Sequence, residues 1–108
     1  MKALIIDDDA IRVPTLTRYA TSLLGECEVT HSLTFTPDWE GFDLILLDHD
    51  LGKGGDVSRH VSEAFPEGYN GRAWVIVHSM NPVGARNIVH TLGAGRVMPY
   101  SAILSRFS

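Results

Sequence analysis

Three short, largely apolar runs constrain the fold more than any other feature of the sequence. The runs are Ala3–Ile6, Phe42–Leu47 and Ala73–Val77. A strand with one solvated face alternates apolar and polar side chains, whereas a strand buried on both faces consists almost entirely of apolar ones. The runs are also too short for typical helices. We therefore expect three central strands of a sheet that is covered on both faces.

Helical patterns separate these runs along the chain. Apolar residues recur at helical spacing in three segments, and two weaker strands and a short last helix complete the pattern. The helical segments are 13–24, 57–65 and 85–92, the weaker strands are Cys27–Thr30 and Val97–Met98, and the last helix is Ser101–Phe107. Pro14 fits the first turn of the first helix, and Gly25 ends it. Strands that alternate with helices predict a parallel five-stranded sheet in a doubly wound α/β domain.

We expect a single domain that spans residues 1–108. A chain of this length with 44% hydrophobic residues suits one core. The segment between Thr30 and Phe42 is too short for a full crossover helix and contains a proline and a glycine, so we expect an irregular connection there. Trp39 and Trp74 are expected in the core.

Charge and cysteine content narrow the functional classes. The net charge of −4 argues against binding to duplex nucleic acid, which needs a basic surface. No apolar run approaches the about 20 residues that a membrane helix needs, so no membrane role is expected. The single cysteine, Cys27, cannot form an internal disulfide, and the chain begins with a strand pattern rather than a leader. We therefore expect a cytoplasmic protein.

Stretches with ionisable or polar side chains directly follow the three apolar runs. Asp7–Asp9 follow the first run, Asp48–Asp50 follow the second, and His78–Asn81 follow the third. Because the carboxyl ends of parallel strands meet in one crevice, we expect these side chains to lie together. Carboxylates in one crevice repel each other unless a cation neutralises them, and oxygen ligands suit hard divalent ions. The sequence therefore predicts a metal site.

The stretches LIIDDD and LILLDHDL resemble the receiver domains of bacterial response regulators. This resemblance implies a flavodoxin-like sheet with strand order 2-1-3-4-5, although the second and last helices of this sequence are expected to be truncated. It also implies a Mg²⁺ or Mn²⁺ ion, whose ligands would be Asp7, Asp8, Asp48 and the backbone carbonyl of Asp50. Asp48 matches the residue that accepts the phosphoryl group in receivers.

Two positions depart from the receiver pattern. Receivers have a serine or threonine at the end of the fourth strand and a lysine after the fifth strand, just before a proline. Here the first position is His78, or Ser79 if the register shifts by one, and the second is Met98, before Pro99. Without the lysine, a phosphoryl group on Asp48 loses the cation that neutralises its charge, so an ordinary phosphorylation switch is not expected.

The stretches LDHDLGKGG and VHSMNPVGA are similar to a divergent branch of the receiver superfamily, the cyclic-phosphate-processing receiver-like domains. Members of that branch are predicted phosphoesterases, so the resemblance implies that a small cyclic phosphate is the substrate. This match is more specific than the match to receivers in general.

The residue chemistry suggests roles for the individual side chains. His78 could protonate the leaving alkoxide, because its pKa lies near working pH, and His49 is the alternative donor or a metal ligand. Asn81 could bind a phosphoryl oxygen or orient His78. Weaker candidates for binding the substrate are Ser79, Lys53, Gly52 and Arg12. Either a water molecule or His78 could be the nucleophile.

Three functions are open from the sequence. The first is a metal-dependent phosphodiesterase that hydrolyses a cyclic nucleotide, a cyclic dinucleotide or a 2′,3′-cyclic phosphate end. The second is a stand-alone receiver that accepts a phosphoryl group on Asp48. The third is a non-catalytic pseudo-receiver that binds a partner or ligand. No sequence feature selects an oligomeric state.

Overall fold

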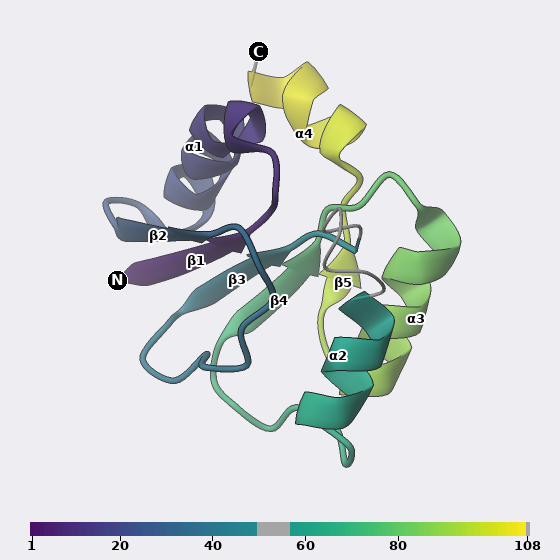
Figure 1. The fold of residues 1–108 in the computed structure, drawn as a ribbon. Coiled ribbons are helices and arrows are strands. Elements are labelled where there is room, and N and C mark those ends of the chain that lie inside the picture. Colours follow the sequence, from purple (N-terminus) through teal and green to yellow (C-terminus); the bar gives the residue numbers. More distant parts are fainter. Residues whose placement is uncertain (50–56, 108) are drawn as a thin grey trace.

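The computed structural model describes residues 1–49 and 57–107, and its centre is a single parallel sheet (Figure 1). The strands lie in the order β2-β1-β3-β4-β5, which confirms the predicted topology. Their bounds are Lys2–Ile6 for β1, Glu28–Ser32 for β2, Leu44–Leu47 for β3, Trp74–Val77 for β4 and Arg96–Val97 for β5.

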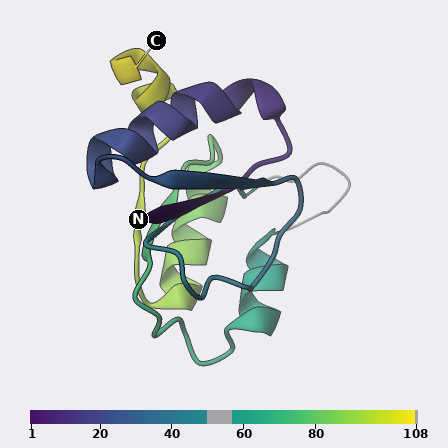
Figure 2. The same ribbon diagram turned by 90° about the vertical axis from the view of Figure 1, so that its left-hand side faces the viewer.

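In the described part of the chain, four α-helices and one 3₁₀ turn surround the sheet. They are η1 (Ala10–Arg12), α1 (Val13–Leu24), α2 (Val57–Ala64), α3 (Pro82–Leu92) and α4 (Tyr100–Phe107). The helices α1 and α4 cover one face of the sheet, and α2 and α3 cover the other (Figures 1 and 2). This arrangement confirms the doubly wound α/β fold. Among residues 1–49 and 57–107, no helix is long and apolar enough to cross a membrane.

Burial on both faces explains why the apolar runs do not alternate. Along β1, Leu4 and Ile6 pack in the core beneath α2 and α3, whereas Ala3 and Ile5 pack in the core beneath α1 and α4. All four residues of β3 are buried in the same alternating way. A polar side chain at any of these positions would lose its water without gaining a hydrogen-bond partner.

Local signals set the ends of the helices. Gly25 follows α1 with a φ of 77°, a conformation that glycine adopts without strain. At the start of α3, the side-chain oxygen of Asn81 accepts a hydrogen bond from the Gly84 N–H at 3.0 Å. Gly93 ends that helix with a φ of 69°.

The connection between β2 and β3 contains no helix, in agreement with the predicted irregular segment. Trp39 of this connection is only 2% exposed and packs its ring against Phe65 and Tyr69. The prediction of a buried Trp74 is wrong, because its side chain is 40% exposed. Trp74 pairs with Leu44 of β3 on one side, but on the other side the short strand β5 begins at Arg96, opposite Ile76, and does not reach Trp74. The Arg96 guanidinium covers the indole at 4.8 Å.

Candidate functional site

The register of the central strands places Asp7, Asp48 and His78 side by side. Ile6 pairs with Leu47, and Leu47 pairs with Val77, so the residue that follows each strand lies at the same edge of the sheet. Backbone hydrogen bonds continue the pairing by one step. The Asp48 N–H donates to the Ile6 carbonyl at 2.9 Å, and the His78 N–H donates to the Leu47 carbonyl at 3.0 Å.

The side chains of these three residues form a buried cluster. The residues Asp7 and His78 have no exposed surface, and Asp48 is 3% exposed. His78 Nε2 lies 2.9 Å from Asp7 Oδ2. One potential ligand atom from each of the three residues lies within 4.8 Å of the other two. The cluster could therefore hold one metal ion.

The two carboxylates of the cluster differ in their electrostatic environment. Burial raises the pKa of Asp7, but the hydrogen bonds from His78 and the Asp9 N–H, with the charges of His78 and Arg12, outweigh it and leave that pKa below its ordinary value. Burial also raises the pKa of Asp48, and the negative charge of the nearby Asp7 carboxylate raises it further. The charges of His78 and Arg12 lower this pKa but do not outweigh these two effects, so it stays above its ordinary value. Asp48 therefore lacks enough positive charge around it, whereas Asp7 has enough.

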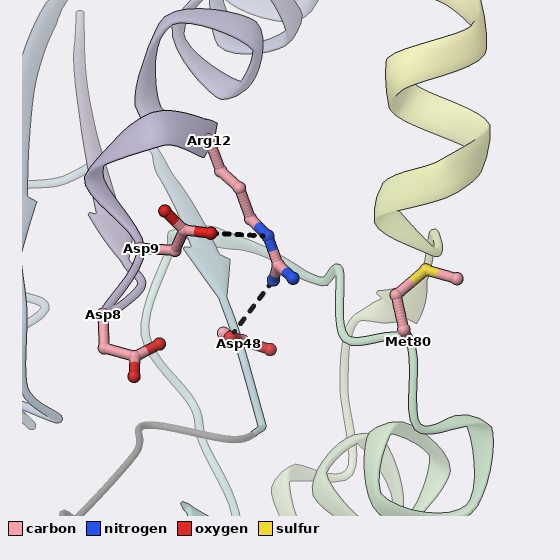
Figure 3. A pocket seen from close by; sticks show the side chains of 5 residues that line it. All are labelled: Asp8, Asp9, Arg12, Asp48 and Met80. Carbon is pink, nitrogen blue, oxygen red and sulfur yellow. Dashed lines mark ion pairs between the residues drawn. The ribbon is translucent and has the colours of Figure 1, made fainter.

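Arg12 brings a permanent cation to the cluster. Its guanidinium lies 3.6 Å from Asp48 Oδ2 and 3.7 Å from Asp7 Oδ2 and, on its other side, 3.7 Å from Asp9 Oδ2 (Figure 3). The ring of Tyr100, the first residue of α4, lies against the same guanidinium at 4.9 Å. The side chain is therefore held at the edge of the sheet by carboxylates and by an aromatic face.

A cavity of about 410 Å³ opens next to the cluster. Its lining consists of Asp8, Asp9, Arg12, Asp48 and Met80. In Figure 3, Arg12 extends from the end of η1, directly before α1, toward Asp48, and Met80 lies on the opposite side of the cavity. A second cavity, of about 570 Å³, lies around the aromatic side chains that precede β3 and β4, away from the cluster. Of these two cavities, the first is lined by one residue of the buried cluster, Asp48, and the described lining of the second includes none.

Comparison with protein families identifies the domain. The model of the cyclic-phosphate-processing receiver domain matches residues 3–94. The chain belongs to this family. Among curated protein sequences, none matches the chain significantly.

Several solved structures similar to this cyclic-phosphate-processing receiver domain are response regulators. The phosphorylated cyanobacterial phytochrome response regulator RcpA has a TM-score of 0.69 and 20% identity, over 98% of this chain and 84% of the other. A Burkholderia pseudomallei response regulator with a phosphorylated aspartic acid, a calcium ion and citrate has a TM-score of 0.63 and 19% identity, over 99% and 66% of the two chains. The Thermotoga maritima response regulator DrrB has a TM-score of 0.59 and 23% identity, over 97% of this chain and 49% of its own length. These similarities establish the receiver fold.

The receiver domain places the other predicted site residues in several environments. Asp8 is exposed and lines the cavity. The Ser79 hydroxyl is buried and accepts a hydrogen bond from the Asn81 N–H at 3.0 Å, while the Asn81 side chain caps α3. Roles for Ser79 and Asn81 at the substrate stay predictions. The predicted residues Asp50, Gly52 and Lys53 lie outside the described residues.

His49 packs against the first turn of α3 and is not part of the buried cluster. Its side chain is largely buried, and its backbone N–H donates to Asp48 Oδ1 at 2.8 Å. A Cβ atom at Gly84 would lie only 2.6 Å from Cδ2 and Nε2 of the His49 ring. Gly84 therefore makes room for this imidazole. The predicted role of His49 as proton donor or metal ligand stays a prediction.

Some features of the site were not recognised from the sequence. The direct contact between Asp7 and His78 joins residues 71 positions apart and depends on the order of the strands. Tyr100 and Met80 were not considered as site residues, although each follows a strand end by only a few positions. The only available signal was that position, because neither residue type carries obvious phosphate or metal chemistry.

The buried cluster fits a divalent cation. Its donor set consists of two carboxylates and one imidazole from Asp7, Asp48 and His78. Burial is the main cause of the raised pKa of Asp48, and the charges of His78 and Arg12 do not outweigh it. A cation bound there would supply the missing charge.

Proposed function

We propose that the domain hydrolyses a small cyclic phosphodiester with a divalent metal ion held by the Asp7, Asp48 and His78 cluster. The observation that carries this proposal is the position of the cluster next to the 410 Å³ cavity, which it shares with the Arg12 guanidinium. The family description, cyclic-phosphate processing, supports the same class of substrate.

When bound, the metal ion would act as a Lewis acid toward the phosphoryl oxygens and lower the pKa of an attacking water molecule. Arg12 supplies positive charge from the protein itself. Its planar guanidinium faces the cavity beside Asp48 and can donate two hydrogen bonds to a phosphoryl group. Met98, at the position of the receiver lysine, cannot provide such a charge. Arg12 therefore takes over the neutralisation of the phosphoryl oxygens.

Asp8 and Asp9 shape the other side of the cavity. The Asp9 carboxylate holds the Arg12 guanidinium and accepts a hydrogen bond from the Ile11 N–H at 3.0 Å, so it fixes the start of η1. Asp8 is exposed to the cavity and can bind a water molecule or a ribose hydroxyl of the substrate. These carboxylates would repel any phosphate that is not neutralised by Arg12 and a metal ion.

Two roles are open to the His78 imidazole. It can donate a proton to the leaving alkoxide, or it can be the third ligand of the metal ion. The other predicted proton donor is His49. The start of α3 lies nearby and is fixed by the Asn81 cap.

The size and charge of the site favour a small substrate over a long RNA. The cavity volume falls in the range of roughly 300–1,000 Å³ that is typical of small-molecule sites. The net charge of −4 disfavours a polyanionic chain that would lie across the surface. A cyclic mononucleotide or dinucleotide therefore suits the site better than a 2′,3′-cyclic phosphate at the end of an RNA strand.

The test is a hydrolysis panel. It contains 2′,3′-cyclic nucleotides, 3′,5′-cyclic nucleotides and cyclic dinucleotides, each with Mg²⁺, Mn²⁺ or EDTA, and products are separated by chromatography. We expect metal-dependent turnover by the wild-type domain, and its loss in Asp48→Asn and Arg12→Ala. Asp38→Asn is the matched control, because Asp38 is exposed and lies in the β2–β3 connection, outside the site. Absence of turnover with every substrate and metal would overturn the proposal.

The similarity to signalling receivers supports a second candidate function. In this alternative Asp48 accepts a phosphoryl group and the domain signals through a partner. Incubation with acetyl phosphate and Mg²⁺, followed by intact-mass measurement, would reveal the added phosphoryl group, and Asp48→Asn would prevent it. The third alternative, a non-catalytic binder, predicts neither turnover nor phosphorylation.

A further inference from the structure

We infer that Met80 determines specificity: its side chain is the surface on which an aromatic base of the substrate lies, so the domain prefers a nucleoside cyclic phosphate to a cyclic phosphate without a base. This inference rests on the proposed function for the position of the phosphoryl group beside Asp48 and Arg12. It adds the residue that contacts the other end of the substrate.

The cavity next to the buried cluster has a charged side and an apolar side. Its lining includes four ionisable residues, which are Asp8, Asp9, Arg12 and Asp48. The fifth lining residue, Met80, is apolar, and Figure 3 shows it across the cavity from Arg12. A phosphoryl group that binds on the charged side therefore leaves the rest of a small substrate facing Met80.

The Met80 side chain is accessible to a ligand. It is 53% exposed and lies between β4 and α3. Single exposed apolar side chains are normal on a protein surface, but this one lines a cavity, where a ligand can cover it. The thioether of methionine is polarisable and makes favourable contacts with aromatic rings. Every nucleobase has a flat π-face that can make such a contact.

The first turn of α4 fixes the two sides of the cavity relative to each other. The Tyr100 ring lies against the Arg12 guanidinium at 4.9 Å, and the next residue, Ser101, donates its backbone N–H to Met80 Sδ at 3.3 Å. The turn is itself attached to the sheet edge, because the Tyr100 N–H donates to the His78 carbonyl at 2.9 Å. Both contact surfaces are thus in place before a substrate binds, which lowers the entropic cost of binding.

This arrangement predicts how substrates are ranked. A cyclic phosphate without a base would leave the apolar surface of Met80 in contact with water. A base that covers this surface adds binding free energy in proportion to the apolar area removed from water. A purine covers more area than a pyrimidine, so we expect purine nucleoside cyclic phosphates to bind more tightly than pyrimidine ones.

Steady-state kinetics with two matched substrates test the inference. One is an adenosine cyclic phosphate, and the other is the methyl riboside that carries the same cyclic phosphate without a base. We expect Met80→Ala to raise KM for the adenosine substrate about three- to tenfold, with kcat unchanged, because the contact stabilises the ground state and the transition state equally. The kinetics of the methyl riboside should change less than about twofold.

Two further variants complete the kinetic test. Met80→Leu should retain most of the affinity for the adenosine substrate, because it keeps an apolar side chain of similar size. Trp74→Leu is the matched control, because Trp74 is also an exposed apolar residue but lies at the opposite end of β4 from His78. An equal effect of Met80→Ala on both substrates, or no effect on either, would overturn the inference.

Nuclear magnetic resonance of the wild-type domain tests the contact without turnover. The probe is adenosine monophosphate with MgCl₂, added to protein that carries ¹³C-labelled methionine. We expect nuclear Overhauser effects between the adenine ring protons and the Met80 side chain, whose signals are assigned by their loss in Met80→Leu. Met1, at the start of the chain, should show none. Absence of these effects at saturating nucleotide, or absence of any nucleotide binding, would overturn the inference.

The experiments separate this inference from the proposed function. Contact between adenine and Met80 in a domain that hydrolyses no cyclic phosphate would support the base-binding role and refute the phosphodiesterase. Equal hydrolysis of the adenosine substrate and the methyl riboside, without an effect of Met80→Ala, would support the phosphodiesterase and refute the base-binding role.

Discussion

Replacement of Gly84 by alanine should destabilise the domain even though alanine is the better helix former. Gly→Ala inside a helix contributes at most about 1 kcal/mol of stability. The added methyl group would lie 2.6 Å from two atoms of the buried His49 ring, which must shift. Overpacking of this kind costs about 1–3 kcal/mol. We therefore expect a net loss of about 1 kcal/mol, equivalent to a fall in Tm of about 4–8 °C for a domain of this size.

Urea and thermal unfolding, followed by circular dichroism in EDTA, measure this loss. Asn87→Ala is the matched control on the same helix, because Asn87 is exposed and the change should stabilise the domain by about 0.5 kcal/mol. A double-mutant cycle with His49→Ala isolates the steric contact, and its coupling energy should be about 1–3 kcal/mol. A Gly84→Ala variant that is as stable as the wild type and shows no coupling to His49→Ala would refute the reasoning.

Four further predictions concern the charged cluster and its surroundings. Burial raises the pKa of Asp48, so its contribution to stability is present below its unfolded pKa and lost as pH rises; Asp48→Asn should raise the Tm at pH 7 in EDTA. The pKa of Asp7 is lowered despite burial, so its contribution to stability is present above its unfolded pKa and lost as pH falls through its folded pKa. Asp7→Asn should therefore lower the Tm at pH 7. Tm shifts of the same sign in Asp48→Asn and Asp7→Asn would contradict this assignment. Arg12→Lys should reduce kcat/KM about tenfold or more, because a lysine cannot donate two parallel hydrogen bonds to a phosphoryl group. The metal affinity measured by calorimetry should stay within a few-fold of the wild-type value. Unchanged kinetics would exclude Arg12 from phosphate binding. Loss of the α3 cap in Asn81→Ala should cost about 1 kcal/mol in urea unfolding, and a neutral result would contradict the capping role.

The architecture could be predicted from the sequence because burial determines the strand patterns directly. The runs at β1, β3 and β4 are apolar on both faces, and no other element of this length tolerates that composition. The position of Trp74 could not be predicted in the same way. Its exposure depends on where β5 begins, which two weakly patterned residues, Arg96 and Val97, decide.

The site could be predicted in outline and not in its contacts. That Asp7 and Asp48 lie at one edge follows from their place after parallel strands. The pairing of Asp7 with His78 and the position of Arg12 between two carboxylates depend on side-chain directions that no local pattern encodes. Sequence reasoning therefore assigned His78 to proton transfer without revealing that its imidazole contacts Asp7.

The two outer strands of the sheet also affect how copies of the domain can associate. An unpaired strand edge is a template for strand addition and aggregation when it is long and apolar. Here β2, with the sequence EVTHS, is largely polar, and β5 has only two residues. Neither edge offers a long apolar template. We therefore expect that any self-association of the domain occurs through helical surfaces and that the folded state resists growth into extended sheets.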